Sequence, residues 1–307
     1  MPPAGDPAVG APVARGNLRR VTKIEAPEAV SYDCGDVVLR GDRWVGGDRG
    51  EVLFLHGGGQ TRHSWGGAAR ALAAQGWTTT TLDLRGHGDS DWSPDGTYGV
   101  NRYAGDIARV VEQMGRGLVL VGASLGGMTA LTVAGRNPGA VRALVLVDIV
   151  PNTVSAGVQR IREFMRAHLD GFDDLDQVAD AVASYTHRPR RNNPEGLKKN
   201  VRQREDGRWY WHWDPAMMQI VPNDEPRPGV QPGALLDLAR TVTLPVLVVR
   251  GGRSDVVDDE GIAEFLAAVP TARVVDVAEA GHMVVGDDND DFTSAVSGFL
   301  EELGTGV

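Results

Sequence analysis

A serine between glycines is the residue of this sequence with the clearest potential for chemistry. Ser124 is the centre of the Gly-Ala-Ser-Leu-Gly segment 122–126, between the apolar run 118–121 and an apolar helical pattern over 128–134. A strand that turns sharply into a helix strains the serine backbone. It also brings neighbouring chain close to the positions two residues before and after the serine, which favours glycine at both. The free N–H groups of the helix N-terminus would then stabilise an oxyanion forming at the serine. The pattern predicts a nucleophile, although an ordinary strand-to-helix turn also fits it.

Two further side chains can complete the chemistry. A serine hydroxyl is a weak nucleophile at neutral pH, so it needs a base within hydrogen-bond reach and an acid that orients the base. His282 follows the apolar strand pattern 272–277, and Asp255 follows the pattern 245–249. Because the carboxyl ends of parallel strands meet at one edge of a sheet, both are expected near Ser124. We therefore predict a triad of Ser124, Asp255 and His282.

The glycine-rich loop after the strand pattern 51–55 is the expected second half of the site. An oxyanion hole needs two N–H donors about 3 Å from the developing negative oxygen. The backbone N–H of Leu125 is one expected donor. Gly58, with Gly59 beside it, is expected to supply the other, although the loop also fits a flexible turn. His56 is expected to hold this loop by hydrogen bonds rather than to take part in the reaction.

The elements that must position these residues form a regular series. Short apolar strand patterns alternate with helical patterns, which predicts an α/β fold with a mostly parallel central sheet flanked by helices. A hairpin is expected over 30–46. Further strands are expected at 51–55, 78–82, 118–121, 143–148, 245–249 and 272–277, and helices at 65–75, 101–114, beyond 126 and 291–303.

The alternation stops after the sixth strand. Residues 151–241 carry helical patterns and no convincing strand, which predicts a helical lid over the carboxyl edge of the sheet. The core is then formed by 26–150 and 242–307, and residues 1–25, rich in proline, alanine and glycine, are expected to be a flexible tail.

Aromatic side chains are concentrated in one stretch of the expected lid. Trp209, Trp211 and Trp213 either pack the lid or contact a substrate, and Trp65 and Gly59 are further candidates for the pocket. An adaptable apolar wall is expected from the following residues: Phe164, Met165, Met217 and Met218. The basic residues between 188 and 204 form either a solvated surface or a field that steers an anionic substrate.

Composition excludes several functional classes. The 307 residues are 42% hydrophobic and 23% charged, without the run of about 18 apolar residues that crosses a membrane. A formal charge of −10 argues against nucleic acid as the main partner. Cys34 is the only cysteine, so neither an intrachain disulfide nor a Cys/His zinc site is expected. Without an apolar secretory signal, a cytoplasmic location is expected.

Together these residues resemble the α/β-hydrolase superfamily over about residues 30–303. The resemblance rests on His-Gly-Gly-Gly at 56–59, Asp-Leu-Arg-Gly-His-Gly-Asp-Ser at 83–90, Gly-Ala-Ser-Leu-Gly-Gly at 122–127, Asp255 and Gly-His at 281–282. The chain order serine, acid, histidine is typical of this family. Gln60 and Trp65 add a similarity to bacterial, mycobacterial-type single-lid carboxylesterases. The resemblance implies hydrolysis of a small-molecule ester through an acyl-enzyme, with no metal or organic cofactor.

The acid has an alternative within this family. Asp148 ends the sixth strand pattern, and some enzymes of this type orient their histidine from that strand. We favour Asp255, because the glycine-rich loop before it resembles the usual acid-bearing turn. Asp148 would then bind N–H groups of a loop at the base of the lid.

The residue type of the nucleophile also distinguishes between the activities of related enzymes. Epoxide hydrolases and haloalkane dehalogenases use an aspartate where this sequence has Ser124, so the resemblance argues against both. Cofactor-free haloperoxidase or perhydrolase activity uses the same triad and stays an alternative. So do hydrolysis of a lactone, an amide or a carbon–carbon bond, and a non-catalytic ligand receptor on the same fold. The sequence does not indicate an oligomeric state.

Overall fold

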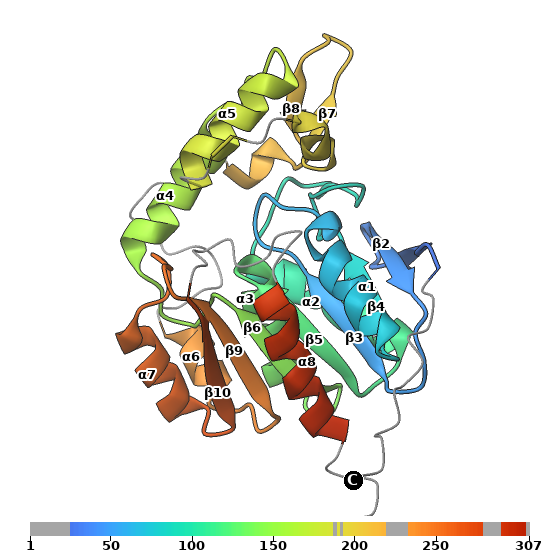
Figure 1. Cartoon of the computed structure of the whole chain (residues 1–307), viewed down its shortest axis with the longest axis vertical. Coiled ribbons are helices and arrows are strands. Elements are labelled where there is room, and N and C mark those ends of the chain that lie inside the picture. The colour runs from blue at the N-terminus through green and yellow to red at the C-terminus, as the bar shows by residue number, and fades with distance from the viewer. Residues whose placement is uncertain (1–24, 187–188, 191–192, 219–232, 279–289, 305–307) are drawn as a thin grey trace, which may run out of the picture.

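An eight-stranded sheet is the centre of the computed structural model, which describes residues 25–186, 189–190, 193–218, 233–278 and 290–304 (Figure 1). The strand order is β1-β2-β4-β3-β5-β6-β9-β10. These strands are β1 (Glu28–Asp33), β2 (Val38–Trp44), β3 (Glu51–Leu55), β4 (Thr78–Leu82), β5 (Leu118–Ala123), β6 (Val141–Val147), β9 (Val246–Gly251) and β10 (Ala272–Val277). β2 is antiparallel to β1 and β4, and the other pairs are parallel. The predicted hairpin and mostly parallel sheet are confirmed.

Helices cover both faces of the sheet. They are α1 (Gly66–Ala74), α2 (Val100–Met114), α3 (Leu125–Arg136), α6 (Ala234–Ala239), α7 (Asp259–Ala268) and α8 (Asp290–Gly304), with the short 3-10 helix η1 (Arg62–Trp65) before α1. In β5, Leu118 and Leu120 face the core cluster under α2, α3 and α7, whereas Val119 and Val121 face the cluster under α1 and α8. This alternation explains the continuous apolar run, because both faces of a parallel strand are buried. No helix among the described residues is long and apolar enough to cross a bilayer.

The insertion, residues 151–241, differs in part from the sequence-based prediction. It contains α4 (Ser155–Arg166), α5 (Leu175–Thr186), η2 (Pro194–Lys199), β7 (Val201–Gln203), β8 (Trp209–Trp211) and η3 (Pro215–Met218). Figure 1 shows α4, α5 and the β7–β8 hairpin above the sheet edge where α3 begins. The prediction of no strand here was wrong, because strands of three residues are too short to show an alternating pattern. The last helix of the insertion, α6, packs on the core rather than above the sheet edge, with Leu238 against Gly135 of α3.

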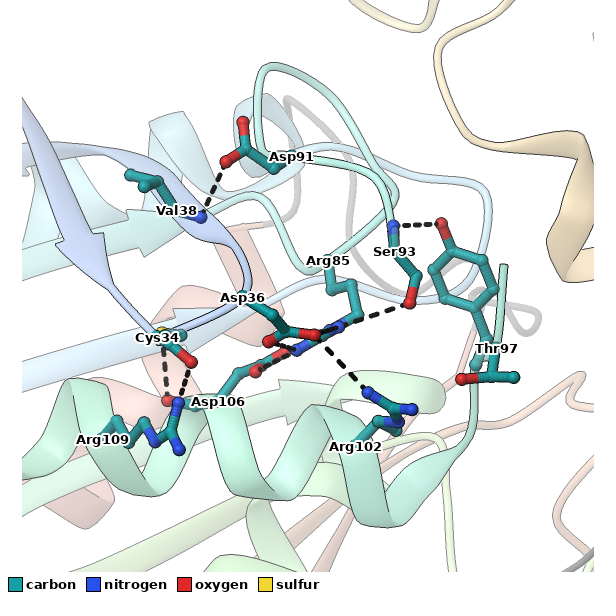
Figure 2. A network of polar contacts seen from close by, with 12 residues as sticks. Cys34, Asp36, Val38, Arg85, Asp91, Ser93, Thr97, Arg102, Asp106 and Arg109 are labelled. Carbon is teal, nitrogen blue, oxygen red and sulfur yellow. Dashed lines mark hydrogen bonds and ion pairs between the residues drawn. The ribbon is translucent and has the colours of Figure 1, made fainter. Parts of the chain in front are cut away.

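A buried arginine anchors the loop that follows β4. Arg85 donates to the two carboxylate oxygens of Asp106 at 2.8 and 2.7 Å and to those of Asp36 at 2.8 Å each (Figure 2). Asp106 belongs to α2, and Asp36 lies between β1 and β2. Paired, fork-like hydrogen bonds of this kind restrict direction as well as distance. The loop 83–90 is therefore fixed to two separate elements.

Close backbone contacts at the turn between β5 and α3 predict a large penalty for one added methyl group. A Cβ on Gly126 would lie well inside 3.0 Å of the Leu55 carbonyl oxygen, whereas a Cβ on Gly105 in α2 would meet nothing within 4 Å. Gly126→Ala should lower the free energy of unfolding by about 1–3 kcal/mol or more, because backbone atoms cannot give way.

Gly105→Ala is the matched control, since both glycines are helical. It should raise the free energy of unfolding by about 0.5–1 kcal/mol, because alanine loses less backbone entropy on folding. Urea unfolding measures both variants. Equal effects of the two substitutions would contradict the close approach at Gly126.

Candidate active site

The turn at Ser124 has the strained geometry that the sequence predicts. Ser124 lies between β5 and α3 with φ 46° and ψ −112°, a left-handed φ that few residues other than glycine adopt. Its N–H donates to the Val147 carbonyl at the end of β6 over 3.1 Å. A Cβ on Gly122 would fall well inside 3.0 Å of the Gly126 carbonyl oxygen, so both flanking glycines are required.

The glycine-rich loop lies beside this serine. A Cβ placed on Gly57 would lie 3.5 Å from the Ser124 Cβ. On the other side, Leu125 is the first residue of α3, so its N–H has no acceptor in a preceding helical turn. The structure thus places Leu125 and Gly57, the neighbour of the expected donor Gly58, on two sides of the same serine.

Hydrogen bonds within the loop single out one of its N–H groups. The Gly57 N–H donates to the Gln60 side-chain oxygen over 3.0 Å, and the Gln60 N–H donates to the Gly57 carbonyl over 3.1 Å. The Gly59 N–H donates to His87 Nε2 over 3.2 Å. The Gly58 N–H donates to none of the residues that the structure describes. Among the three glycine N–H groups, that of Gly58 is thus the one without an acceptor in the described part of the chain.

His56 holds the base of this loop. It is fully buried, its Nδ1 lies 2.8 Å from the Gly57 carbonyl oxygen, and its Nε2 accepts from the Leu84 N–H over 3.0 Å. Burial lowers the pKa of His56 to about 4, so the ring is neutral near pH 7. Both ring nitrogens are engaged by backbone, which agrees with the expected structural role.

The two candidate acids lie in different surroundings. Asp148 is fully buried directly after β6, has φ 48°, and accepts from the Gly251 N–H over 2.9 Å and from the Ser254 hydroxyl over 2.7 Å. The Asp255 side chain is 35% exposed and pairs with Arg160 of α4 at 3.0 Å. Asp148 thus has the environment of a fixed buried carboxylate, and Asp255 that of a surface ion pair.

The expected base, His282, lies outside the described residues. It follows β10, which runs parallel to β9 and ends at Val277. The strand that precedes it thus ends at the same sheet edge as the strands before Ser124 and Asp148.

The expected pocket residues fall into separate groups. Trp65 is fully buried in the core, with ring centroids 5.1 Å from Phe54 and 5.5 Å from Phe292, so its expected role in the pocket gives way to core packing. Trp211 and Trp213 are buried in the apolar cluster of the insertion, and the half-buried Trp209 packs against it. These three rings hold the insertion together.

One methionine of α4 lies against the glycine-rich loop 56–60. The Met165 sulfur lies 3.8 Å from the position of a Cβ on Gly58, and its Cε lies 3.4 Å from that on Gly59. Its place agrees with an apolar wall. The sequence analysis named Met165 together with Phe164, Met217 and Met218, and no local signal separated it from those three residues.

Several basic residues of the insertion are paired. Arg190 contacts Asp176, Lys198 contacts Glu195 at 2.7 Å, and Arg202 contacts Asp89 at 2.9 Å; all of these lie on the surface. Their charge is locally compensated, which favours a solvated surface over steering of an anionic substrate.

Sequence reasoning did not assign roles to Ser254, Arg160 and His87. Ser254 binds Asp148, Arg160 binds Asp255, and His87 binds the glycine-rich loop. The sequence singled out the segment 83–90, which contains His87, and the loop before Asp255, which contains Ser254, but gave neither residue a role. The partners of all three come from other elements, so a local pattern could not reveal them.

Comparisons with known proteins agree with the resemblance to α/β hydrolases. The model of the α/β hydrolase fold family matches residues 51–288. An esterase of Mycobacterium tuberculosis, Rv0045c, is 31% identical over 84% of this chain and 85% of its own, and mouse ABHD11, an sn-1-specific diacylglycerol lipase, is 28% identical over 81% and 80%. The crystal structure of E-2-(acetamidomethylene)succinate hydrolase superposes with a TM-score of 0.75 at 27% identity, covering 90% of this chain and 99% of that one.

The buried histidines predict a loss of stability on acidification. Burial lowers the pKa of His56 to about 4 and that of His87 to about 3, both below the ordinary value of about 6.5. The unfolded chain therefore binds protons below about pH 6.5, whereas the folded chain does not. Stability is full above that pH and falls by roughly 1.4 kcal/mol per pH unit and histidine until the folded pKa is reached.

Urea unfolding at about pH 7 and about pH 5 measures this effect. His56→Gln should show a smaller decrease in the free energy of unfolding between the two pH values than the unsubstituted protein. A decrease of the same size would mean that His56 is not held neutral by the fold.

Proposed function

The chain belongs to the α/β-hydrolase family, and on that basis we propose that it hydrolyses carboxylic esters by acyl transfer to Ser124. The observation that carries this proposal is the strained Ser124 between the N-terminus of α3 and the glycine-rich loop that contains Gly58. The names of the relatives, an esterase and a diacylglycerol lipase, support the same reaction class.

Each proposed step uses one of these groups. His282 takes the proton of Ser124 as the hydroxyl oxygen attacks the ester carbonyl carbon, and the carbonyl oxygen becomes an oxyanion bound by the N–H groups of Gly58 and Leu125. The tetrahedral intermediate collapses, and His282 returns the proton to the leaving alcohol. Water, deprotonated by His282, then attacks the acyl carbon; the bond to the Ser124 oxygen breaks, His282 returns the proton to that oxygen, and the carboxylic acid is released. None of these steps draws on a metal or an organic cofactor.

For the orienting acid, the surroundings of the two carboxylates lead us to propose Asp148 and to keep Asp255 as the alternative. Asp148 directly follows Val147, whose carbonyl accepts from Ser124, and its carboxylate is oriented by an N–H and a hydroxyl group. Asp255 is already paired with Arg160. A buried, oriented acceptor suits the support of an imidazolium better than an exposed ion pair.

The insertion gives this site an apolar side. Met165 lies against Gly58 and Gly59, so an acyl group bound at the proposed oxyanion hole would meet a flexible thioether. This contact favours an uncharged acyl chain next to the reacting carbonyl.

Loss of the nucleophile tests the reaction class. Ser124→Ala should lower kcat for p-nitrophenyl esters by several orders of magnitude and abolish labelling by a fluorophosphonate, because no other group forms the acyl-enzyme. Ser31→Ala, on the exposed edge strand β1, is the matched control and should retain both. A panel that adds lactones and amides identifies the bond. Retained turnover in Ser124→Ala would overturn the proposal.

A pair of isosteric variants separates the two acids. Asp148→Asn should lower kcat by about 10²–10⁴-fold, because an amide cannot support the imidazolium, whereas Asp255→Asn should cost less than about tenfold. Steady-state kinetics on one ester decides between them, with circular dichroism as the control for folding. A larger loss in Asp255→Asn would reassign the acid to Asp255.

A further inference from the structure

His87 is a buried side chain that the proposed mechanism does not use. It lies in the loop 83–90, fully buried, with Nδ1 3.0 Å from the Arg85 carbonyl oxygen. A carbonyl oxygen only accepts, so Nδ1 carries the proton and Nε2 offers a lone pair. The Gly59 N–H donates to this Nε2 over 3.2 Å. Burial lowers the pKa of His87 to about 3, so the ring keeps the neutral form that this bond requires.

The bond from Gly59 fixes one of the two peptide units that flank the Gly58 α-carbon. The other unit contains the Gly57 carbonyl and the Gly58 N–H, which point in opposite directions across a trans peptide. That carbonyl is held by the tight turn of the loop and by His56 Nδ1 at 2.8 Å. The Gly58 N–H thus points opposite to the Gly57 carbonyl, and the bond from Gly59 limits rotation of the backbone about the Gly58 α-carbon.

The backbone of His87 is fixed as firmly as its ring. Residue 87 pairs with Trp213 in an antiparallel bridge, and the Asp214 N–H donates to the Gly86 carbonyl over 2.8 Å. The ring also lies edge-on to that of His56, with centroids 4.8 Å apart. His87 therefore offers a rigid acceptor to Gly59, whereas the side chains of His56 and Gln60 hold Gly57.

We propose that His87 is a positioning residue of the oxyanion hole: by accepting the Gly59 N–H it aims the Gly58 N–H at the reacting carbonyl oxygen. The inference rests on the proposed acyl transfer at Ser124. Its effect should fall on the transition state more than on the ground state, because the oxyanion exists only in the former.

The test compares His87→Leu, which removes the acceptor, with His87→Gln, whose amide oxygen retains one. Two quantities are measured: the steady-state kinetics on one ester, and the inhibition constant of an arylboronic acid, which forms a tetrahedral adduct with a catalytic serine. His87→Leu should lower kcat and boronate affinity by about 10- to 100-fold, while KM changes by less than about threefold. This loss does not exceed the one expected when an oxyanion-hole donor is removed completely. His87→Gln should recover most of both.

Thr79→Val is the matched control for stability. It removes one buried side-chain hydrogen bond, from Thr79 to the Ala69 carbonyl at 3.0 Å, in β4 and away from the glycine-rich loop. It should retain kcat and boronate affinity. Unchanged kcat and boronate affinity in His87→Leu, or equal losses in His87→Leu and His87→Gln, would overturn the positioning role.

A measurement on the unsubstituted protein does not depend on how the variants fold. Nitrogen NMR of the histidine rings should show His87 with its proton on Nδ1 and none on Nε2 between about pH 5 and about pH 8. A proton on Nε2 would overturn the proposal. Fluorophosphonate labelling distinguishes failure of the proposed acyl transfer from failure of the role of His87. If Ser124 is not labelled, acyl transfer itself is refuted. If Ser124 is labelled normally and His87→Leu leaves kcat and boronate affinity unchanged, only the role of His87 is refuted.

Discussion

The close backbone contact between the turn at Ser124 and the end of β3 is the constraint on which the site depends. Gly126 leaves no room for a side chain next to the Leu55 carbonyl, and Leu55 leads directly into the glycine-rich loop 56–60. One contact therefore brings the strained serine and the glycine-rich loop together. Because parallel strands β3 and β5 are neighbours in the sheet, their carboxyl ends are placed side by side before any side chain takes part.

Glycines give this site its geometry but no rigidity, and two buried histidines replace what is missing. His56 and His87 are neutral rings whose nitrogens are all engaged by backbone groups, two of them in the glycine-rich loop. A neutral imidazole can donate at one nitrogen and accept at the other. One ring can therefore bind the carbonyl of one peptide unit and the N–H of another. The cost is a fold that becomes less stable as the pH falls.

The sheet and its helices could be predicted because their signals are local. The apolar run 51–55 and the threonine-rich run 78–82 are strands with the same bounds in the structure, since strands buried on both faces are formed by apolar or β-branched residues. The turn at Ser124 could be predicted because its steric demand fixes the residue types beside it. The β7–β8 hairpin, the buried Trp65 and the partners of Asp148 and Asp255 could not, because each depends on packing between distant segments.

A crystal structure of the protein after reaction with a phosphonate ester would test the proposed acyl-transfer site at Ser124, with Gly58 and Leu125 as oxyanion donors. We expect phosphorus bonded to the Ser124 oxygen and a phosphoryl oxygen about 3 Å from both N–H groups. Phosphorus on another residue, or a phosphoryl oxygen directed away from both N–H groups, would contradict it.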